Sequence, residues 1–162
     1  MLGVNLRLQR IFKEYRVSHP KLPDAATYAA CKQIIEHSSY LTDTGNFEGY
    51  AALFVESGQL KRPNGEPMVG RAAIVDSYRT RPAERMTRHM VGHSVMEQLD
   101  DGRVHAVTSV LLWSTQTTAS VEAFGRKADP RQVLGEYDDI LICTPEGWRI
   151  EKRVSSFLIY RE

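Results

Sequence analysis

Residues 87–97 read Thr-Arg-His-Met-Val-Gly-His-Ser-Val-Met-Glu, and this stretch predicts a β-strand that carries two histidines. Valine and threonine favour the extended backbone of a strand, and methionine supplies further apolar side chains. An imidazole that is buried without a partner costs free energy. His89 must therefore face solvent, bond to a partner, or work in a cavity, and the rest of the chain has to supply that partner or cavity.

Length and composition describe an ordinary globular protein. A chain of 162 residues is best interpreted as one domain, which at this size buries roughly 70% of the surface of its unfolded chain. The net charge of +1, from 21 basic and 20 acidic residues, gives no case for a nucleic-acid partner, which requires a clustered basic face.

The sequence contains no membrane-spanning or targeting signal that we can identify. No apolar run approaches the ~18 residues that cross a bilayer, and Asn5 and Arg7 interrupt any signal-peptide core. Cys31 and Cys143 lie far apart within apolar patterns, so we expect both to be buried, reduced thiols rather than a disulfide. These features predict a cytoplasmic protein without contact to membranes.

The first half of the chain is helical in character. Residues 1–17 mix apolar and basic side chains and predict a helical arm, and Ser18–Pro23 is a linker, so the domain should comprise residues 24–162. Three helices are expected in that domain before residue 82. The first is capped by Asp24 and runs to about Leu41, the second follows an N-cap at Asn46 and includes Phe54 and Val55, and the third begins at Gly70.

The second half is β in character. Alternating apolar residues predict strands separated by turn signals, at residues 57–62, 87–99, 104–117, 133–143 and 148–160. A longer loop, residues 118–132, either covers a pocket or is a passive connection. Helices followed by consecutive strands indicate an α+β fold with an antiparallel sheet of four to six strands.

Five segments in order resemble motifs of SnoaL-like members of the nuclear-transport-factor-two-like superfamily, over roughly residues 25–155. Each matches a short family motif, and the segments are Thr42-Asp43-Thr44-Gly45-Asn46-Phe47 with Ala52-Leu53-Phe54, Val69-Gly70-Arg71-Ala72-Ala73-Ile74, Thr87-Arg88-His89-Met90-Val91-Gly92, Gly135-Glu136-Tyr137-Asp138-Asp139, and Gly147-Trp148-Arg149-Ile150. The resemblance implies a cone-shaped curved antiparallel sheet, with three helices closing a pocket.

The resemblance also implies a site. In scytalone-dehydratase-like members, an aspartate at the Asp43 position and a histidine at the His89 position form a dyad in the pocket. Thr42 stands where scytalone dehydratase has a tyrosine, and its second pocket histidine falls near Ser109, so the dehydratase set is incomplete here. The dyad can perform general acid–base chemistry, in which the carboxylate fixes the imidazole tautomer. The alternative is a structural hydrogen bond without turnover.

Further residues are candidates for the lining of the pocket. Tyr137 is the preferred catalytic hydrogen-bond donor, because it shares one strand face with Asp139. The remaining substrate-binding candidates are Tyr40, Tyr50, His93, Ser109, Trp113 and Asp139. Each has a plainer alternative: the tyrosines pack in the core, His93 is exposed, and Trp113 belongs to the core or a dimer interface. Arg153 is expected at the surface, with pairing to a carboxylate or an anionic substrate as the alternatives.

A metal site is not expected. His89 and His93 are four residues apart, which separates them by about 13 Å on a strand, too far to share one ion.

The sequence thus favours a cofactor-free enzyme, a lyase or isomerase that dehydrates, isomerises or cyclises a hydrophobic, oxygenated small molecule. His89 is the base, Asp43 its orienting partner and Tyr137 the donor to a developing oxyanion. The alternative is a non-catalytic ligand-binding or assembly subunit that resembles the small subunit of ring-hydroxylating dioxygenases. In either case, the resemblance implies a homodimer formed through the outer face of the sheet.

Overall fold

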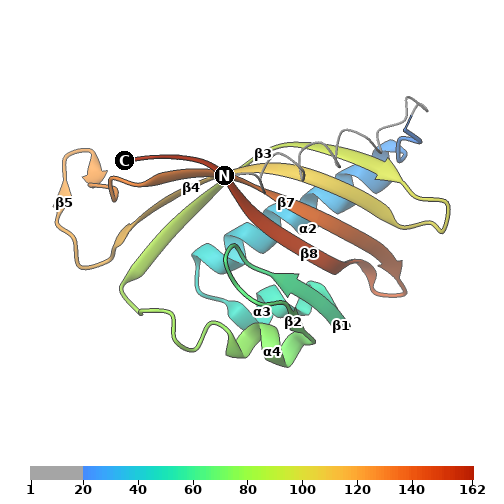
Figure 1. Cartoon of the computed structure of the whole chain (residues 1–162), viewed down its shortest axis with the longest axis horizontal. Coiled ribbons are helices and arrows are strands. Elements are labelled where there is room, and N and C mark those ends of the chain that lie inside the picture. Colours follow the sequence, from blue (N-terminus) through green and yellow to red (C-terminus); the bar gives the residue numbers. More distant parts are fainter. Residues whose placement is uncertain (1–19) are drawn as a thin grey trace, which may run out of the picture.

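A computed structural model describes residues 20–162, which form three helices and eight strands (Figure 1). The elements in chain order are α2 (Ala25–Asp43), α3 (Phe47–Ala52), β1 (Phe54–Lys61), β2 (Met68–Val69), α4 (Arg71–Asp76), β3 (Arg85–Gln98), β4 (Val104–Gln116), β5 (Val121–Glu122), β6 (Gly125–Arg126), β7 (Gln132–Thr144) and β8 (Gly147–Arg161). The arm expected in residues 1–17 lies outside the described residues.

Six strands form one sheet in the order β2-β1-β8-β7-β4-β3. The neighbours pair antiparallel, except that β1 runs parallel to β8, so the sheet is mixed and differs in this pairing from the antiparallel prediction. The first residues of β1 lie beside the first residues of β8, where the Ile150 amide donates to the Leu53 carbonyl at 2.9 Å. The two strands therefore run in the same direction. The α+β prediction of three helices and a curved sheet is otherwise confirmed.

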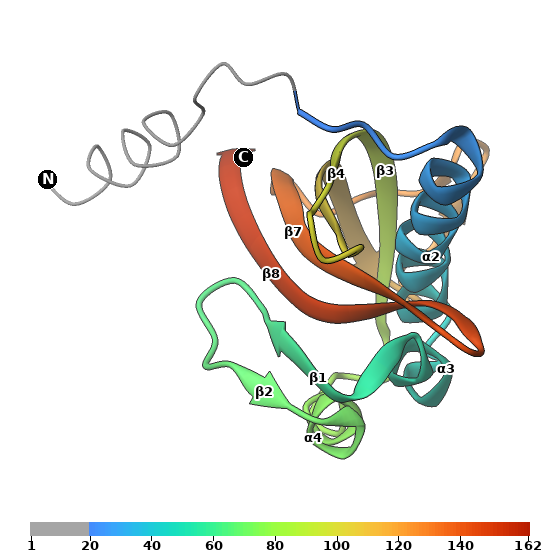
Figure 2. The ribbon, with the colours of Figure 1, turned by 90° about the vertical axis from the view of Figure 1, so that its right-hand side faces the viewer.

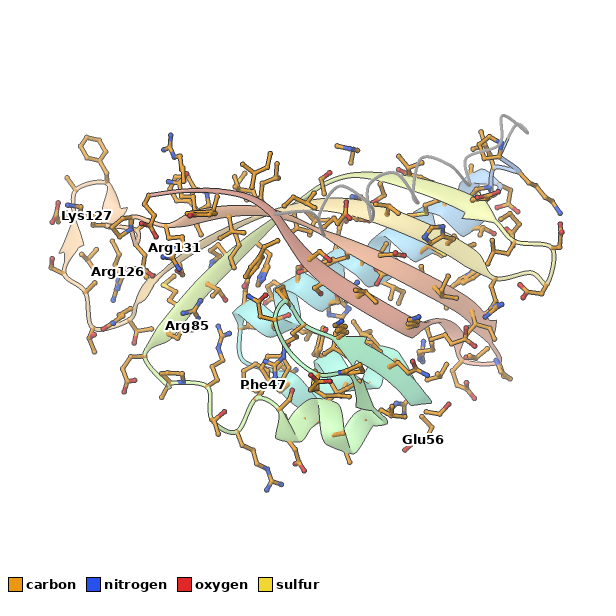
Figure 3. The ribbon with its side chains drawn as sticks, in the orientation of Figure 1. Phe47, Glu56, Arg85, Arg126, Lys127 and Arg131 are labelled. Carbon is orange, nitrogen blue, oxygen red and sulfur yellow. The ribbon has the colours of Figure 1, made fainter. Side chains whose placement is uncertain are left out.

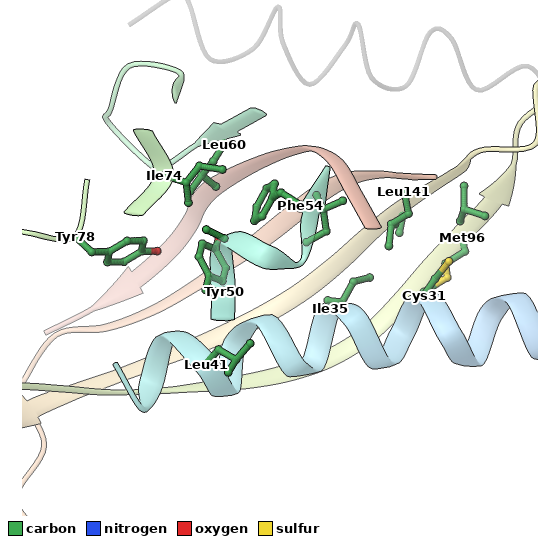
Figure 4. Packing of buried hydrophobic residues seen from close by; sticks show 14 residues of the cluster. Cys31, Ile35, Leu41, Tyr50, Phe54, Leu60, Ile74, Tyr78, Met96 and Leu141 are labelled. Carbon is green, nitrogen blue, oxygen red and sulfur yellow. The ribbon is translucent and has the colours of Figure 1, made fainter. Parts of the chain in front are cut away.

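The core lies between the helices and the concave side of the sheet. The sheet curls around this space while α2 runs alongside β3, and α3 and α4 lie beside the short strands (Figure 2). Fully buried apolar side chains from α2, α3, α4 and several strands form one cluster, and ten of its members are labelled in Figure 4. In it, Cys31 and Ile35 of α2 are 0% exposed. Cys143, by contrast, is exposed rather than buried as predicted.

The local signals around α2 and α3 act as the sequence predicts. The Asp24 carboxylate accepts a hydrogen bond from the Thr27 amide at 2.7 Å, and the Asn46 side chain accepts one from the Gly49 amide at 2.8 Å. Gly45 has a φ of 75°, the left-handed conformation in which α2 can end. The second helix is shorter than predicted, because Phe54 starts β1 and is buried there instead.

A bulge in β3 changes which side chains face the core. The register with β4 shifts between Val91 and Ser94. Before the shift, Thr87 and His89 point to the concave side; after it, Met96 does, at 3% exposure. His93 is therefore turned to the opposite face from His89, so the two imidazoles cannot share a ligand.

The predicted loop at residues 118–132 contains its own small hairpin of β5 and β6. Its tip exposes Phe124 completely, and it extends beyond the sheet at one end of the molecule (Figure 1). Among residues 20–162, no helix is long and apolar enough to cross a membrane.

Candidate active site

A cavity of about 170 Å³ lies on the concave side of the sheet, next to α3 and α4. Its wall is mainly apolar, and the apolar side chains are Leu60, Val110, Leu112, Val133 and Phe157. A few polar groups converge on it, including His89, Tyr137 and Arg81. This combination of an apolar wall and a few polar groups is typical of small-molecule sites. A cavity of about 150 Å³ can hold one benzene ring.

The structure brings Asp43 into contact with His89, which lines this cavity. Asp43 is the last residue of α2, and His89 lies on β3, which packs against that helix. Asp43 Oδ1 lies 2.6 Å from His89 Nδ1, and Oδ2 accepts the His89 backbone amide at 2.7 Å. Thr87 Oγ1 donates to Oδ1 at 2.8 Å. Three bonds therefore fix one carboxylate, whose side chain is 8% exposed.

The hydrogen bonds set the charge of this pair. Burial disfavours ionisation of Asp43, but the hydrogen bonds and charge of His89 outweigh it and lower the pKa of Asp43 below its ordinary value. Since an ionised carboxylate can only accept, His89 Nδ1 must carry the proton that it shares with Asp43. In the neutral ring, Nε2 is then an unprotonated acceptor. Within residues 20–162 no protein group bonds to Nε2, and His89 lines the cavity.

Tyr137, the predicted hydrogen-bond donor, also lines the cavity. Its hydroxyl lies 3.4 Å from Ser39 Oγ, and the Arg153 guanidinium stacks 4.1 Å from its ring centroid. Burial raises the pKa of Tyr137, so the hydroxyl keeps its proton at neutral pH. Gly135, two residues earlier, forms part of the wall, and a Cβ there would collide with the Ser156 carbonyl. Tyr50 contributes a second hydroxyl and is 4% exposed.

Asp139 does not line the cavity, and the expected surface position of Arg153 is wrong. Both side chains are buried, at 0% and 2% exposure. Arg153 Nε and Nη2 donate to the two Asp139 oxygens at 2.7 and 2.8 Å, and Nη1 donates to Ser38 Oγ at 2.6 Å. Burial disfavours the charged guanidinium, but Asp139 outweighs this effect and raises the pKa of Arg153 above its ordinary value. The pair joins β7, β8 and α2 below Tyr137.

Four other candidates also lie away from the cavity. Ser109 and Trp113 occupy the outward positions of β4, because the inward set of that strand is Val104, Ala106, Thr108 and Val110. The β3 bulge places His93 on the same outer face, where its Nε2 lies 3.3 Å from Ser109 Oγ. Tyr40 is 64% exposed and borders a second crevice, beside α2 and β3, which Asp43 and His89 also line.

Two arginines of the cavity wall were missed by the sequence prediction. Arg81 Nη2 donates to Thr87 Oγ1 at 2.9 Å, so it extends the Asp43–His89 network by one residue. Arg62 donates to the Ser77 carbonyl at 2.8 Å and stacks on Tyr78, with its Cζ atom 4.6 Å from the ring centroid. In the sequence both stand next to a proline and resemble ordinary turn residues. Only the fold brings them to the cavity.

The same part of the chain, residues 20–162, contains no group of three or more His, Cys, Asp and Glu side chains that could hold a metal ion. The polar residues that line the cavity are instead one histidine, one glutamate, two arginines and several residues with hydroxyl groups.

Comparison with known proteins identifies relatives with this architecture. A family model described as SnoaL-like domain matches residues 23–154. No curated protein matches the chain in sequence.

Several solved structures are similar to the chain over most of its length. One from Catenulispora acidiphila, in complex with S-DNPA, is 24% identical with a TM-score of 0.63, and covers 83% of this chain and 95% of its own. A provisionally assigned scytalone dehydratase from Novosphingobium aromaticivorans is 18% identical with a TM-score of 0.70, covering 83% and 86%. An NTF2-like protein with a cystatin-like fold, from the same organism, is 18% identical with a TM-score of 0.63, covering 98% and 90%. At these identities the likeness shows the fold.

Proposed function

The chain belongs to the SnoaL-like domain family, and we propose that it is a cofactor-free enzyme that dehydrates, isomerises or cyclises a hydrophobic, oxygenated small molecule. One observation carries the proposal. The Asp43 carboxylate holds His89 Nδ1 at 2.6 Å, which leaves Nε2 as an acceptor at the wall of a largely apolar cavity. A histidine oriented by a carboxylate is a suitable general base near neutral pH.

The reaction follows from these roles. His89 Nε2 takes a proton from a carbon next to a carbonyl group, and the electron pair of the broken C–H bond moves onto the carbonyl oxygen. Tyr137, protonated at neutral pH, donates a hydrogen bond to that oxyanion. The ionised Asp43 stabilises the imidazolium that forms. In a dehydration, the imidazolium then gives its proton to a leaving hydroxyl group, which departs as water; in an isomerisation it returns the proton to another carbon.

The relatives support this substrate class. One is provisionally assigned as a scytalone dehydratase, and another was solved in complex with the small molecule S-DNPA. The apolar wall of the cavity suits a ring, and its few polar groups suit oxygen substituents.

The experiment is a turnover screen with polycyclic and phenolic hydroxyketones, using the wild type, His89→Ala and His93→Ala. The two substitutions remove the same side chain from opposite faces of β3. We expect turnover by the wild type and by His93→Ala, and no turnover by His89→Ala. Full turnover by His89→Ala on a substrate of the wild type contradicts the mechanism. Binding of a ligand without any turnover, together with a copurifying large subunit, favours the alternative of a non-catalytic subunit.

We also propose that the chain forms a homodimer through the outer face of the sheet. An apolar row crosses four strands on that face, because cross-strand partners share one side of a sheet. The row consists of Met90, Leu111, Leu134 and Ile159, which pair in succession in the register. Three of these side chains are 37–64% exposed, an unusual surface for a monomer.

Light scattering after size-exclusion chromatography tests the dimer. We expect a dimer for the wild type and a monomer for Leu134→Lys, since a charge in the centre of the row opposes burial. The control is Phe124→Lys, which changes a fully exposed residue between β5 and β6. Equal masses for the wild type and Leu134→Lys contradict this interface.

A further inference from the structure

Three arginines border the space that leads out of the cavity. Arg62 and Arg81 line the cavity itself. Arg85 lines an adjoining groove of about 600 Å³, which shares Leu112, Val133 and Phe157 with the cavity wall. The cavity and the groove therefore adjoin, and this arginine cluster stands along them. Figure 3 shows Arg85 toward the same end of the molecule as Arg126, Lys127 and Arg131.

The arginine cluster forms no ion pair within the described chain; the two carboxylates of the groove, Asp129 and Glu162, are bonded to Ser114 and Arg131 instead. None of the cluster's three guanidinium groups has a carboxylate within 4.0 Å among residues 20–162. Other described arginines also lack an ion pair, but they do not line the cavity or the groove; they are Arg88, Arg126, Arg149 and Arg161. The carboxylate nearest in the network, Asp43, is already bonded to His89 and Thr87. Glu136 contributes to the cavity wall, but it forms no ion pair with the cluster.

The cluster also has unused hydrogen-bond donors. A guanidinium has five N–H donors. Within the described residues Arg62 uses one, to the Ser77 carbonyl, and Arg81 uses one, to Thr87 Oγ1. Burial lowers the pKa of Arg81, the charges of Arg85 and Arg62 lower it further, and Tyr78 and Asp43 act in the opposite direction, so Arg81 experiences repulsion from the other two arginines. An anion placed among them would relieve this repulsion.

We infer that the ligand of this site is an anionic ring compound, whose ring occupies the cavity and whose carboxylate is bound by the arginine cluster. A planar carboxylate matches the paired donors of a guanidinium. At about 170 Å³ the cavity has room for little more than one ring, so an arm must extend into the groove. This inference rests on the proposed function and specifies its substrate class as a carboxylic acid.

Arg81 has a second part in this arrangement. It donates to the same Thr87 hydroxyl that donates to Asp43, at 2.9 and 2.8 Å. A carboxylate bound by Arg81 would therefore lie one residue away from the Asp43–His89 pair. This connection would hold the anionic arm close to the Asp43–His89 pair, so an uncharged analogue with the same ring should bind less tightly.

The test compares a matched pair of one-ring probes, phenylacetic acid and its methyl ester, by NMR titration of backbone amide signals. The wild type should bind the acid about tenfold more tightly than the ester, and added salt should reduce this difference. Arg62→Gln and Arg85→Gln should each reduce the preference for the acid without altering affinity for the ester. Arg149→Gln removes an arginine near the β7–β8 turn and should keep the full preference.

Equal affinities for acid and ester in the wild type overturn the inference, as does a preference that survives in both Arg62→Gln and Arg85→Gln. Failure of the acid to bind also overturns it. None of these outcomes requires turnover. If the His89→Ala screen shows catalysis on uncharged ketones while acid and ester bind equally, the proposed function stands and the carboxylate inference fails.

Discussion

Two pairs of a carboxylate and a basic side chain lie on the concave side of the sheet, and they differ in whether a hydrogen-bonding group remains free for a ligand. In the Asp139–Arg153 pair both side chains are buried, and both carboxylate oxygens are bonded to the guanidinium. In the Asp43–His89 pair the carboxylate is equally saturated, but one imidazole nitrogen faces the cavity without a protein partner within residues 20–162. The first pair can hold the fold together. The second has one group left for chemistry.

The comparison separates two uses of the same type of interaction. A buried ion pair is costly to break, because the remaining partner keeps its charge without compensation. A pair that opens onto a cavity exchanges a proton at little structural cost. The loss of either pair should therefore affect different measurements: unfolding for Asp139–Arg153 and turnover for Asp43–His89. The predictions below test this separation.

The largest effect is expected from His89→Ala. Loss of the general base should lower turnover by about 10²–10⁴-fold. The free energy of unfolding should fall by less than about 2 kcal/mol, since Asp43 keeps its hydrogen bonds from Thr87 Oγ1 and the backbone amide of residue 89. Steady-state kinetics and urea unfolding of one preparation check both quantities. If unfolding of the variant accounted for its lost activity, the assignment of Asp43–His89 to turnover rather than stability would be wrong.

Asp139→Ala should have the reverse profile. It leaves the Arg153 charge buried, so the free energy of unfolding should fall by about 3–5 kcal/mol. Asp138→Ala is the matched control, because the neighbouring carboxylate points outward and is 53% exposed. Urea unfolding of the two variants gives the comparison. Similar losses for both would mean that the buried pair contributes no more than a surface pair.

An intermediate effect is expected from Asp43→Asn in acid. Because the pKa of Asp43 in the folded protein is lowered from its ordinary value of 3.8, its contribution to stability is present above that value. The contribution is lost as the pH falls through the folded pKa. The wild type should therefore exceed Asp43→Asn in unfolding free energy by about 1–3 kcal/mol at neutral pH. This difference should shrink below about pH 4, as measured by thermal unfolding across pH. A constant difference would contradict the ionised state of Asp43.

The smallest effect is expected from a third pair, on the outer face. His105 Nε2 lies 2.8 Å from Asp138, and this hydrogen bond raises the pKa of His105 from its ordinary value of 6.5. Its contribution is full below that value and is lost as the pH rises through the raised pKa. Because this pair is partly exposed to solvent, we expect less than about 1 kcal/mol. His105→Gln should flatten the stability profile above pH 6.5, and an unchanged profile would exclude the contribution.

The sequence predicted the fold well where the signals are local. The cap at Asn46 and the turn at Gly45 depend on neighbouring residues, and both occur where expected. The end of α3 was predicted too late, because Phe54 continues the helical spacing of Phe47 and Tyr50. Burial in the sheet, which no local pattern reveals, decides its conformation in favour of β1.

The site was predictable only in part, for a related reason. Asp43, His89 and Tyr137 were found through the resemblance; His89 and Tyr137 line one cavity, and Asp43 is bonded to His89. Ser109 was assigned to the pocket, but the buried apolar residues of β4 are the even-numbered ones. Strict alternation along the strand therefore puts Ser109 on the outer face. The β3 bulge turned the His93 side chain to the outer face of the sheet. Arg81 joins the site by its hydrogen bond to Thr87 Oγ1, which the sequence does not reveal.

The most direct test of the central contrast is the ¹⁵N NMR signal of the His89 ring at neutral pH, with and without a cavity ligand such as phenylacetic acid. We predict a protonated Nδ1, an unprotonated Nε2, and an Nε2 signal that shifts when the ligand binds. In Asp43→Asn the preference for this tautomer should be lost. A protonated Nε2 in the neutral ring of the wild type, or a signal that a bound ligand leaves unchanged, would contradict the account, since His89 would then be as structural as Arg153.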